Sequence, residues 1–164
     1  MIRKLALPLW CNLNINYVMI TEFQNEYRWL SNFAPVKIKL NGLEFPSVEH
    51  AYMSAKSDDE GWKKFCSNPN NTAGDVKRKS RSILLKDDWN QIKLEVMANC
   101  IEQKFNTEPY RTKLLETEDE YLQEGNRWND KFWGVCLKTN IGDNNLGKII
   151  MNVRYKLREP LNIR

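Results

Sequence analysis

Two long segments, 87–105 and 144–159, carry apolar residues at the 3.6-residue period of an α-helix. In the first segment one apolar stripe is formed by Trp89, Ile92, Val96, Cys100 and Phe105, and it is widened by Leu94, Met97 and Ile101. In the second segment the apolar face consists of Leu146, Ile149, Ile150, Val153 and Leu157. The pattern predicts two amphipathic helices that each bury one face against the rest of the protein.

Shorter patterns predict the remaining elements. Ser47, which follows Pro46, is a typical N-cap for a helix that runs to about residue 57. Alternating apolar and polar residues at 36–45 surround Asn41-Gly42, the signal of a β-hairpin. Further helices are expected at 61–66, within 68–81 and at 109–116, and further strands at 17–23, 120–125 and 131–137. Together these elements predict a helix-rich α+β single domain with a small, mostly antiparallel sheet.

Composition and charge narrow the class of protein. The chain has 164 residues, 41% of them hydrophobic and 28% charged, which suits one globular domain with a sizeable core. A net charge of +4 favours a phosphate-bearing ligand but is too small to require nucleic acid. No apolar run is long enough to span a membrane. We therefore expect no membrane partner, and the four widely spaced cysteines, interpreted as reduced, predict a cytoplasmic protein.

Cysteine and histidine usage argues against a metal site. The four cysteines, Cys11, Cys66, Cys100 and Cys136, are far apart in the sequence, and His50 is the one histidine. No CxxC spacing or His pair offers the ligands of a zinc site. We expect reduced, mostly buried cysteines, no metal and no cofactor.

The N-terminal segment MIRKLALPLWC has basic residues followed by a short apolar run, as a secretory signal has. Pro8 interrupts that run, and no small-residue cleavage site follows. Met19 opens a segment that is typical of a first strand. We therefore expect residues 1–18 to be an extension outside the domain and residues 19–160 to form the domain.

Glu49 is the first candidate for chemistry. It lies in the first turn of the predicted helix, and helix geometry places Tyr52, Met53 and Lys56 along the same side. An acid in a first turn also has an ordinary explanation, because the helix dipole favours a negative charge there by about 0.3–1 kcal/mol. Lys56 can likewise be a solvated lysine at a helix end. This segment by itself leaves both interpretations open.

Three other segments hold candidate site residues. In GNRWNDKFWGV (125–135) three large aromatic residues lie within a few positions of Asp130, which is the combination needed to hold a nucleobase near a charge. The alternative is that these aromatic residues belong to the core, and for two of the three it is the better interpretation. Trp89 follows two aspartates at the start of the longest predicted helix. Ser31 and Asn32 are small polar residues between two apolar ones, in a loop that can present an amide and a hydroxyl to a ligand.

These residues fall in blocks that resemble the NADAR (YbiA-like) family. The first block is YRWLSNFAPVKIKLNGLEFPSVEHAYMSAKS, and VKRKSRSILLKDDWNQIKLEVMANCIEQKF, LLETEDEYLQEGNRWNDKFWG and DNNLGKIIMNVR follow in order. The resemblance runs from about residue 20 to residue 158. One departure is KTNIGDNN (138–145), where the family segment usually holds more glycine. That departure bears on the choice of substrate.

The resemblance implies an N-glycosidase, which cleaves a bond between ribose C1′ and a nitrogen. It places catalytic roles on Glu49, Asp130 and Trp89. It implies substrate-binding roles for the family's SNF motif, which falls on Ser31, Asn32 and Phe33, and for the WG motif, Trp133 and Gly134. From the residues themselves, Lys56, Lys77 and Arg78 are candidate phosphate contacts, whose alternative is solvated helix charge. His50 is a weaker candidate, because it points about a third of the way round the helix from Glu49.

The chemistry of these residue types agrees with that reaction. Breaking a C1′–N bond builds positive charge on the ribose, which a carboxylate stabilises while it orients a water molecule. Among the substrates known for the family, we favour ADP-ribosylated guanine in nucleic acid over phosphoribosylated aminopyrimidines of riboflavin biosynthesis. The expected partner is thus a nucleotide-like substrate, modified DNA included. The remaining alternative is a binding module for ADP-ribose or a nucleotide without turnover, which would gain little from two acids in its pocket.

Overall fold

The computed structural model describes residues 19–159. Its helices are α1 (Val48–Ser54), α2 (Glu60–Ser67), α3 (Ala73–Lys79), α4 (Trp89–Phe105), α5 (Tyr110–Glu116) and α6 (Asn145–Arg158), with the short 3-10 helices η2 (Asn25–Leu30) and η3 (Ser80–Ser82). Its strands are β1 (Met19–Ile20), β2 (Pro35–Leu40), β3 (Leu43–Ser47), β4 (Tyr121–Leu122), β5 (Gly125–Asn126) and β6 (Val135–Cys136). The prediction for residues 1–18 lies outside the described residues. The predicted fold class, a helix-rich α+β domain, is confirmed.

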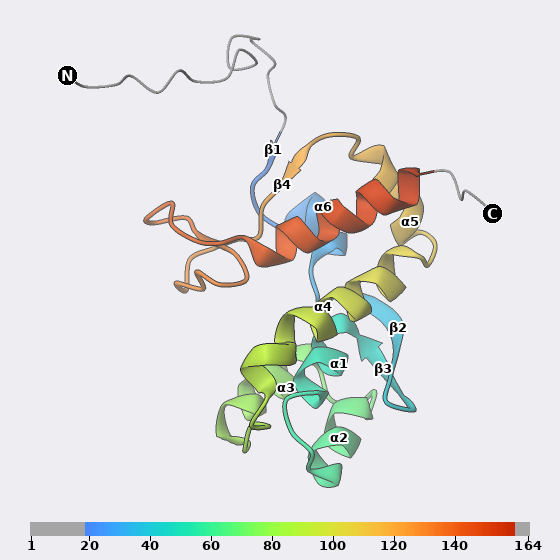
Figure 1. Cartoon of the computed structure of the whole chain (residues 1–164), viewed down its shortest axis with the longest axis vertical. Helices are drawn as coiled ribbons and strands as arrows, with labels where there is room; N and C mark the ends of the chain where they lie inside the picture. Colours follow the sequence, from blue (N-terminus) through green and yellow to red (C-terminus); the bar gives the residue numbers. More distant parts are fainter. Residues whose placement is uncertain (1–18, 160–164) are drawn as a thin grey trace.

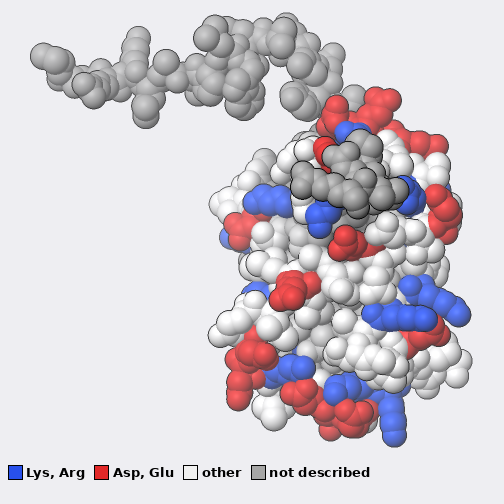
Figure 2. Space-filling view, turned by 45° about the vertical axis from the view of Figure 1, so that its right-hand side comes forward, with Lys and Arg blue, Asp and Glu red and all other residues white. Residues whose placement is uncertain are grey.

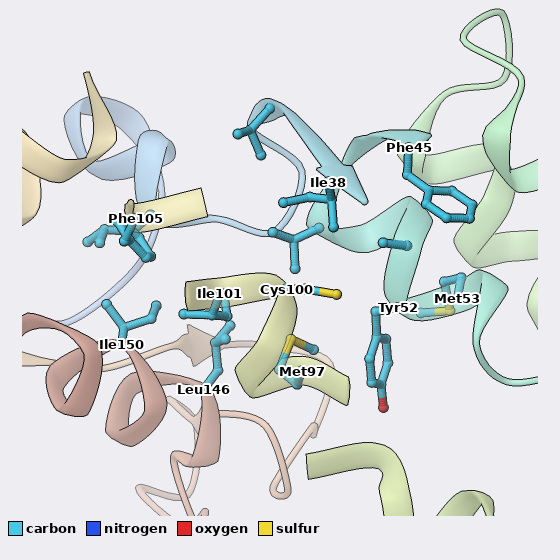
Figure 3. Packing of buried hydrophobic residues seen from close by; sticks show 14 of the residues in the cluster. Ile38, Phe45, Tyr52, Met53, Met97, Cys100, Ile101, Phe105, Leu146 and Ile150 are labelled. Carbon is cyan, nitrogen blue, oxygen red and sulfur yellow. The ribbon is translucent and has the colours of Figure 1, made fainter. Parts of the chain in front are cut away.

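Helix α4 runs through the middle of the domain, with α6 on one side and α1 on the other (Figure 1). Its buried residues Met97 and Ile101 face α6 residues on one side and α1 residues on the other (Figure 3). The predicted apolar stripe of α4 is therefore its core face. Leu94 is an exception, because it is 43% exposed. The prediction that Leu94 widens the buried stripe is therefore wrong.

The strands form three separate two-stranded sheets within the described residues, where the sequence predicted one small sheet. The hairpin of β2 and β3 is antiparallel as predicted, and Asn41 and Gly42 both have positive φ in its turn. The β1–β4 and β5–β6 pairs are parallel and only two residues long on each strand. Within the described residues, the strands expected at 17–23, 120–125 and 131–137 are paired only at 19–20, 121–122, 125 and 135–136, and the residues that follow 20, 122 and 136 are in loops or turns.

Local sequence signals account for the start of the helices that carry the site. Ser47 is the N-cap of α1, and its side chain accepts a hydrogen bond from the backbone N–H of His50. Thr72 and Asp75 form a capping box at the start of α3. Helices α1 and α3 pack against each other, and α1 also packs against α4. The caps therefore fix the direction in which α1 and α3 present their side chains.

The surface carries charges of both signs. In Figure 2 the acidic and basic side chains are interspersed over the visible face rather than gathered by sign. Cys66, Cys100 and Cys136 are buried free thiols, as predicted for these three. Within residues 19–159, no helix is long and apolar enough to cross a bilayer.

Candidate active site

One cavity of about 690 Å³ brings together segments that are far apart in the sequence. It is lined by Phe23, Gln24, Arg28, Ser31, Asn32, Phe33, Glu49, Tyr52, Met53, Lys56, Lys77, Arg81, Met97, Glu124, Gly125, Trp128, Asp130, Trp133 and Leu146. Its volume falls within the range of about 300–1,000 Å³ that is typical of small-molecule sites. Of the predicted site residues, the cavity collects those of the SNF motif, the α1 face and the loop between β5 and β6.

Helix α1 supplies one wall of the cavity. Glu49, Tyr52 and Met53 lie on one side of the helix, and Lys56 follows in the turn after its end. This is the side that helix geometry predicted from the sequence. The ring of Tyr52 lies between the indoles of Trp89 and Trp133, at centroid distances of 5.1 and 5.4 Å. Tyr52 is thus held rigidly beside Glu49.

Glu49 is an acid in a dry position. It is 4% exposed, and burial raises the pKa of its carboxyl, whereas Lys77 and Lys56 lower it. The Nζ of Lys77 lies 3.6 Å from Glu49 Oε1, which is an ion pair longer than a hydrogen bond. An acid that served the helix dipole alone could stay in water. Burial beside two lysines instead suits a carboxylate that meets a ligand.

The turn after η2 presents Ser31, Asn32 and Phe33 to the cavity. The backbone oxygen of Asn32 accepts a hydrogen bond from the N–H of Glu49, so the turn and the start of α1 are joined. The amide of Asn32 donates to Met97 Sδ at 3.5 Å. Lys77 Nζ lies 5.4 Å from the ring centroid of Phe33. The SNF segment and Glu49 therefore form one connected wall.

The loop between β5 and β6 supplies the opposite acid. Asp130 Oδ1 accepts hydrogen bonds from the backbone N–H groups of Phe132 and Trp133, at 3.1 and 2.9 Å. The buried side chain of Asn126 donates to the backbone oxygen of Asp130 and accepts from its N–H. The first two hydrogen bonds hold the carboxyl of Asp130 against the turn that follows it, and the bonds to Asn126 hold its backbone. Oδ2 of Asp130 makes neither of these two hydrogen bonds, and the residue lines the cavity.

Three buried side-chain oxygens within residues 19–159 have no hydrogen-bond partner: Asn32 Oδ1, Glu49 Oε1 and Glu124 Oε2. All three residues line this cavity. A buried polar atom without a partner costs about 1–3 kcal/mol, so a fold rarely collects three in one place without use. Each of these oxygens is an acceptor when the acids are ionised. A ligand that supplies hydroxyl or N–H donors would satisfy them.

The structure places three of the predicted site residues outside the cavity lining. Trp89 is 5% exposed and packs behind Tyr52. His50 is 4% exposed, and its ring nitrogens contact Ser47 Oγ at 2.7 Å and the backbone oxygen of Asn71 at 2.8 Å. Gly134 packs against the backbone of Glu124. All three lie outside the lining of the cavity, and the roles predicted for them from the sequence stay predictions.

Other residues in the cavity were not singled out from the sequence. The charged residues among them are Glu124, Arg28 and Arg81. The phosphate candidate Arg78 is absent from the lining and pairs with Asp75. Neither arginine of the lining makes an ion pair within residues 19–159. No cluster of His, Cys, Asp and Glu in this part of the chain could hold a metal ion. Glu124 is half-buried with its Oε2 shielded from solvent, and although it lies six residues before Asp130, nothing in the sequence indicates this environment.

Lys104 supports the SNF turn from behind, and it leads to a prediction. Its side chain is fully buried, and its Nζ donates to the backbone oxygen of Ser31 at 2.8 Å. Burial lowers the pKa of Lys104 to about 7, and Glu124 opposes this lowering. An unfolded lysine has a pKa of about 10.4, so between pH 7 and 10 the unfolded chain binds more protons than the folded one.

The free energy of unfolding of the wild type, relative to Lys104→Met, should therefore rise with pH over that window. The expected slope is at most about 1.4 kcal/mol per pH unit, and no slope is expected below pH 7. Urea unfolding of both proteins at pH 6, 7.5 and 9 measures the difference. Groups common to both proteins cancel in it. Parallel stability curves would mean that Lys104 stays charged in the folded protein.

The fold and the cavity together define a small helix-rich domain with a buried carboxylate site rimmed by basic and aromatic residues. The profile of the NADAR domain matches residues 19–158, and the chain belongs to this family. In structure the chain is similar to YbiA of Escherichia coli, solved by NMR. The TM-score is 0.75, with 27% identity over 92% of this chain and 94% of that one.

Curated relatives carry two kinds of name. N-glycosidase Npun_R5314 of Nostoc punctiforme is 33% identical over 144 residues, which cover 84% of this chain and 90% of the relative. N-glycosidase YbiA of Escherichia coli is 30% identical over 81% of this chain and 83% of its own length. Riboflavin biosynthesis protein VVA0006 of Vibrio vulnificus is 35% identical over 87% of this chain, but this match spans only 39% of the relative.

Proposed function

We infer that this chain is an N-glycosidase of the NADAR family, a hydrolase of N-glycosyl bonds. We further propose that it removes ADP-ribose from ADP-ribosylated guanine in nucleic acid. The observation that carries the inference is the set of three buried oxygens without a hydrogen-bond partner, on Asn32, Glu49 and Glu124, in one cavity. Ribose hydroxyls and base N–H groups are the donors that such acceptors require. Relatives named N-glycosidases match most of this chain and support the same reaction.

The proposed mechanism uses Glu49 as the central group. As the C1′–N bond lengthens, positive charge develops on the ribose, and a buried carboxylate stabilises that charge more strongly than it would in water. Burial raises the pKa of Glu49, and Lys77 and Lys56 oppose that rise and so favour the ionised form. The same carboxylate is suited to accept a proton from the attacking water. Asp130, held by its own turn, is placed to hydrogen-bond the ribose or the water from the other wall.

The rim of the cavity favours a large, phosphorylated substrate. Arg28 and Arg81 have planar guanidinium groups, which suit phosphate oxygens. Phe33 and Trp128 line the cavity and yet are 36% and 59% exposed. An exposed aromatic ring beside basic residues can stack on a base of a flanking nucleotide, at about 1–3 kcal/mol per base. These features support a substrate that extends beyond a single ribotide.

The second candidate substrate is a phosphoribosylated aminopyrimidine of riboflavin biosynthesis. What favours it is the match to relatives with that name, VVA0006 of Vibrio vulnificus and PYRR of Zea mays, the latter 33% identical over 77% of this chain. This chain spans only 39% and 23% of those proteins. The same Glu49 chemistry would serve this substrate.

One experiment separates the candidates. The full chain is incubated with an oligonucleotide that carries ADP-ribosylated guanine and, separately, with the aminopyrimidine ribotides, and the products are identified by mass spectrometry. We expect release of ADP-ribose and restoration of unmodified guanine. Cleavage of the ribotides alone would assign the second substrate. Tight binding of ADP-ribose with no cleavage of either would contradict an N-glycosidase and favour a binding module.

The exposed indole gives a prediction about the strand. Trp128→Ala should raise KM for the modified oligonucleotide by about 5- to 150-fold, which corresponds to one stacked base. KM for ADP-ribosylated guanosine should change much less, because no flanking base is present. Tyr155→Ala is the matched control, since Tyr155 is 62% exposed on α6 and does not line the cavity. An equal change in KM for both substrates would rule out a contact with the flanking strand.

A further inference from the structure

Glu124 lies at a crowded point between β4 and β5. Its backbone N–H donates to Asn144 Oδ1 at 3.0 Å, and its backbone oxygen accepts from the N–H of Val135 at 2.9 Å. Asn144 is 1% exposed, and its side-chain Nδ2 donates a hydrogen bond to the backbone oxygen of Leu122. The backbone of Glu124 is therefore fixed on both sides. Only its side chain is left to reach the cavity.

The side chain of Glu124 lines the cavity and lacks a partner for Oε2. Burial raises the pKa of its carboxyl to about 7. The charged groups around it act in both directions, because Asp130 and Glu49 raise the pKa whereas Lys77 and Lys104 lower it. A carboxylic acid that keeps its proton near neutral pH is a hydrogen-bond donor as well as an acceptor.

Cleavage of the C1′–N bond also requires a proton donor for the leaving nitrogen. A nitrogen that leaves with the electron pair of the C1′–N bond is a poor leaving group unless it is protonated. Burial raises the pKa of Glu49, and Lys77, within ion-pair distance, and Lys56 oppose that rise. In the proposed mechanism Glu49 accepts the proton of water, and Asp130 Oδ1 accepts two backbone N–H groups, so the proton of the leaving group is assigned to a third acid. Glu124 has no cation within ion-pair distance among residues 19–159.

We propose that Glu124 is the catalytic acid of this site, and that it gives its proton to the nitrogen that leaves ribose C1′. The proposal rests on the inferred N-glycosidase activity. The C1′–N electron pair goes to the nitrogen, which takes the proton of Glu124. Water adds to C1′, and its proton passes to the Glu49 carboxylate. The products are a free ribose hydroxyl and a free amine, and proton exchange with solvent returns both acids to their starting states.

The test is Glu124→Gln, which keeps the shape of the side chain but cannot supply a proton. The variant should cleave a C1′–N substrate 10²- to 10⁴-fold more slowly than the wild type. The wild-type kcat/KM should fall as pH rises above about 7, because the acid loses its proton, and this limb should disappear in the variant. Glu116→Gln, an exposed acid on α5, is the control and should behave as the wild type.

A substrate with an activated leaving group separates chemistry from structure. A ribosyl 5′-phosphate with 4-nitrophenolate at C1′ needs no proton on departure, so Glu124→Gln should cleave it nearly as fast as the wild type does. Equal losses on both substrates, or a retained basic limb, would overturn the role of Glu124. Thermal unfolding at pH 8 checks the fold, and there the variant should be at least as stable as the wild type. If the wild type cleaves no N-glycoside at all, both the proposed function and the role of Glu124 are wrong. If the wild type cleaves the N-glycoside and Glu124→Gln cleaves it equally fast, only the role of Glu124 is wrong.

Discussion

Glu49→Gln is expected to abolish most turnover while it leaves the fold intact. Glutamine has the size of glutamate, and the substitution preserves the hydrogen bond from the backbone N–H of residue 49 to the backbone oxygen of Asn32. It cannot carry the negative charge that stabilises the ribose cation or accept the proton of water. Loss of such a group typically costs about 10²- to 10⁴-fold in rate, or about 3–5 kcal/mol in the barrier.

The stability of Glu49→Gln tests the interpretation of its burial. Because burial raises the pKa of Glu49, the folded state binds more protons than the unfolded state just above pH 4.5. The wild-type carboxylate thus destabilises the fold as pH rises through its folded pKa, and the glutamine variant should match or exceed the wild type in Tm at pH 7.5. Glu44→Gln, an exposed acid on the neighbouring strand β3, is the control for both measurements. A Glu49→Gln protein that turns over at nearly the wild-type rate would leave Glu49 as a helix-start acid only.

Gly134→Ala should damage stability and activity together. A Cβ at this position would collide with the backbone oxygen of Glu124, and it would crowd the amide of Asn126. That oxygen cannot retreat easily, because it accepts the hydrogen bond from Val135. Overpacking of this kind costs about 1–3 kcal/mol. The shift would also displace Glu124 and the turn of Asp130, and a misplacement of about 1 Å in an active site can cost 10²-fold in rate.

Urea unfolding and steady-state kinetics measure the two effects of Gly134→Ala. Gly74→Ala is the matched control: residue 74 lies inside α3, and the nearest atom to a new Cβ is Thr72 Oγ1 at 3.7 Å. That change should be neutral or stabilising by about 0.5–1 kcal/mol, because alanine favours a helix. A Gly134→Ala protein with wild-type stability and kinetics would show that the wall formed by Glu124 can move without consequence.

Several parts of this protein were predictable because they depend on local sequence. The hairpin follows from Asn41-Gly42, the start of α1 follows from Ser47, and the buried face of α4 follows from its apolar period. The common side of Glu49 and Tyr52 follows from helix geometry alone. The resemblance to the NADAR family also needed only ordered motifs. Each of these conclusions depends on residues within a few positions of each other in the sequence, or on the order of the family motifs, and none requires a distance in space.

The environment of each candidate side chain was decided by the tertiary structure. Trp89 and His50 stand in the motifs as plainly as Glu49 does, yet one packs behind Tyr52 and the other bonds to Ser47 and Asn71. Glu124 carries no local signal, and its burial arises only where the β4–β5 segment meets the loop of Asp130. A side chain's solvation, and hence its pKa, depends on contacts that are distant in sequence. Sequence therefore predicted part of the candidate site, and packing decided which of those residues line the cavity, which lie behind it, and that Glu124 joins them.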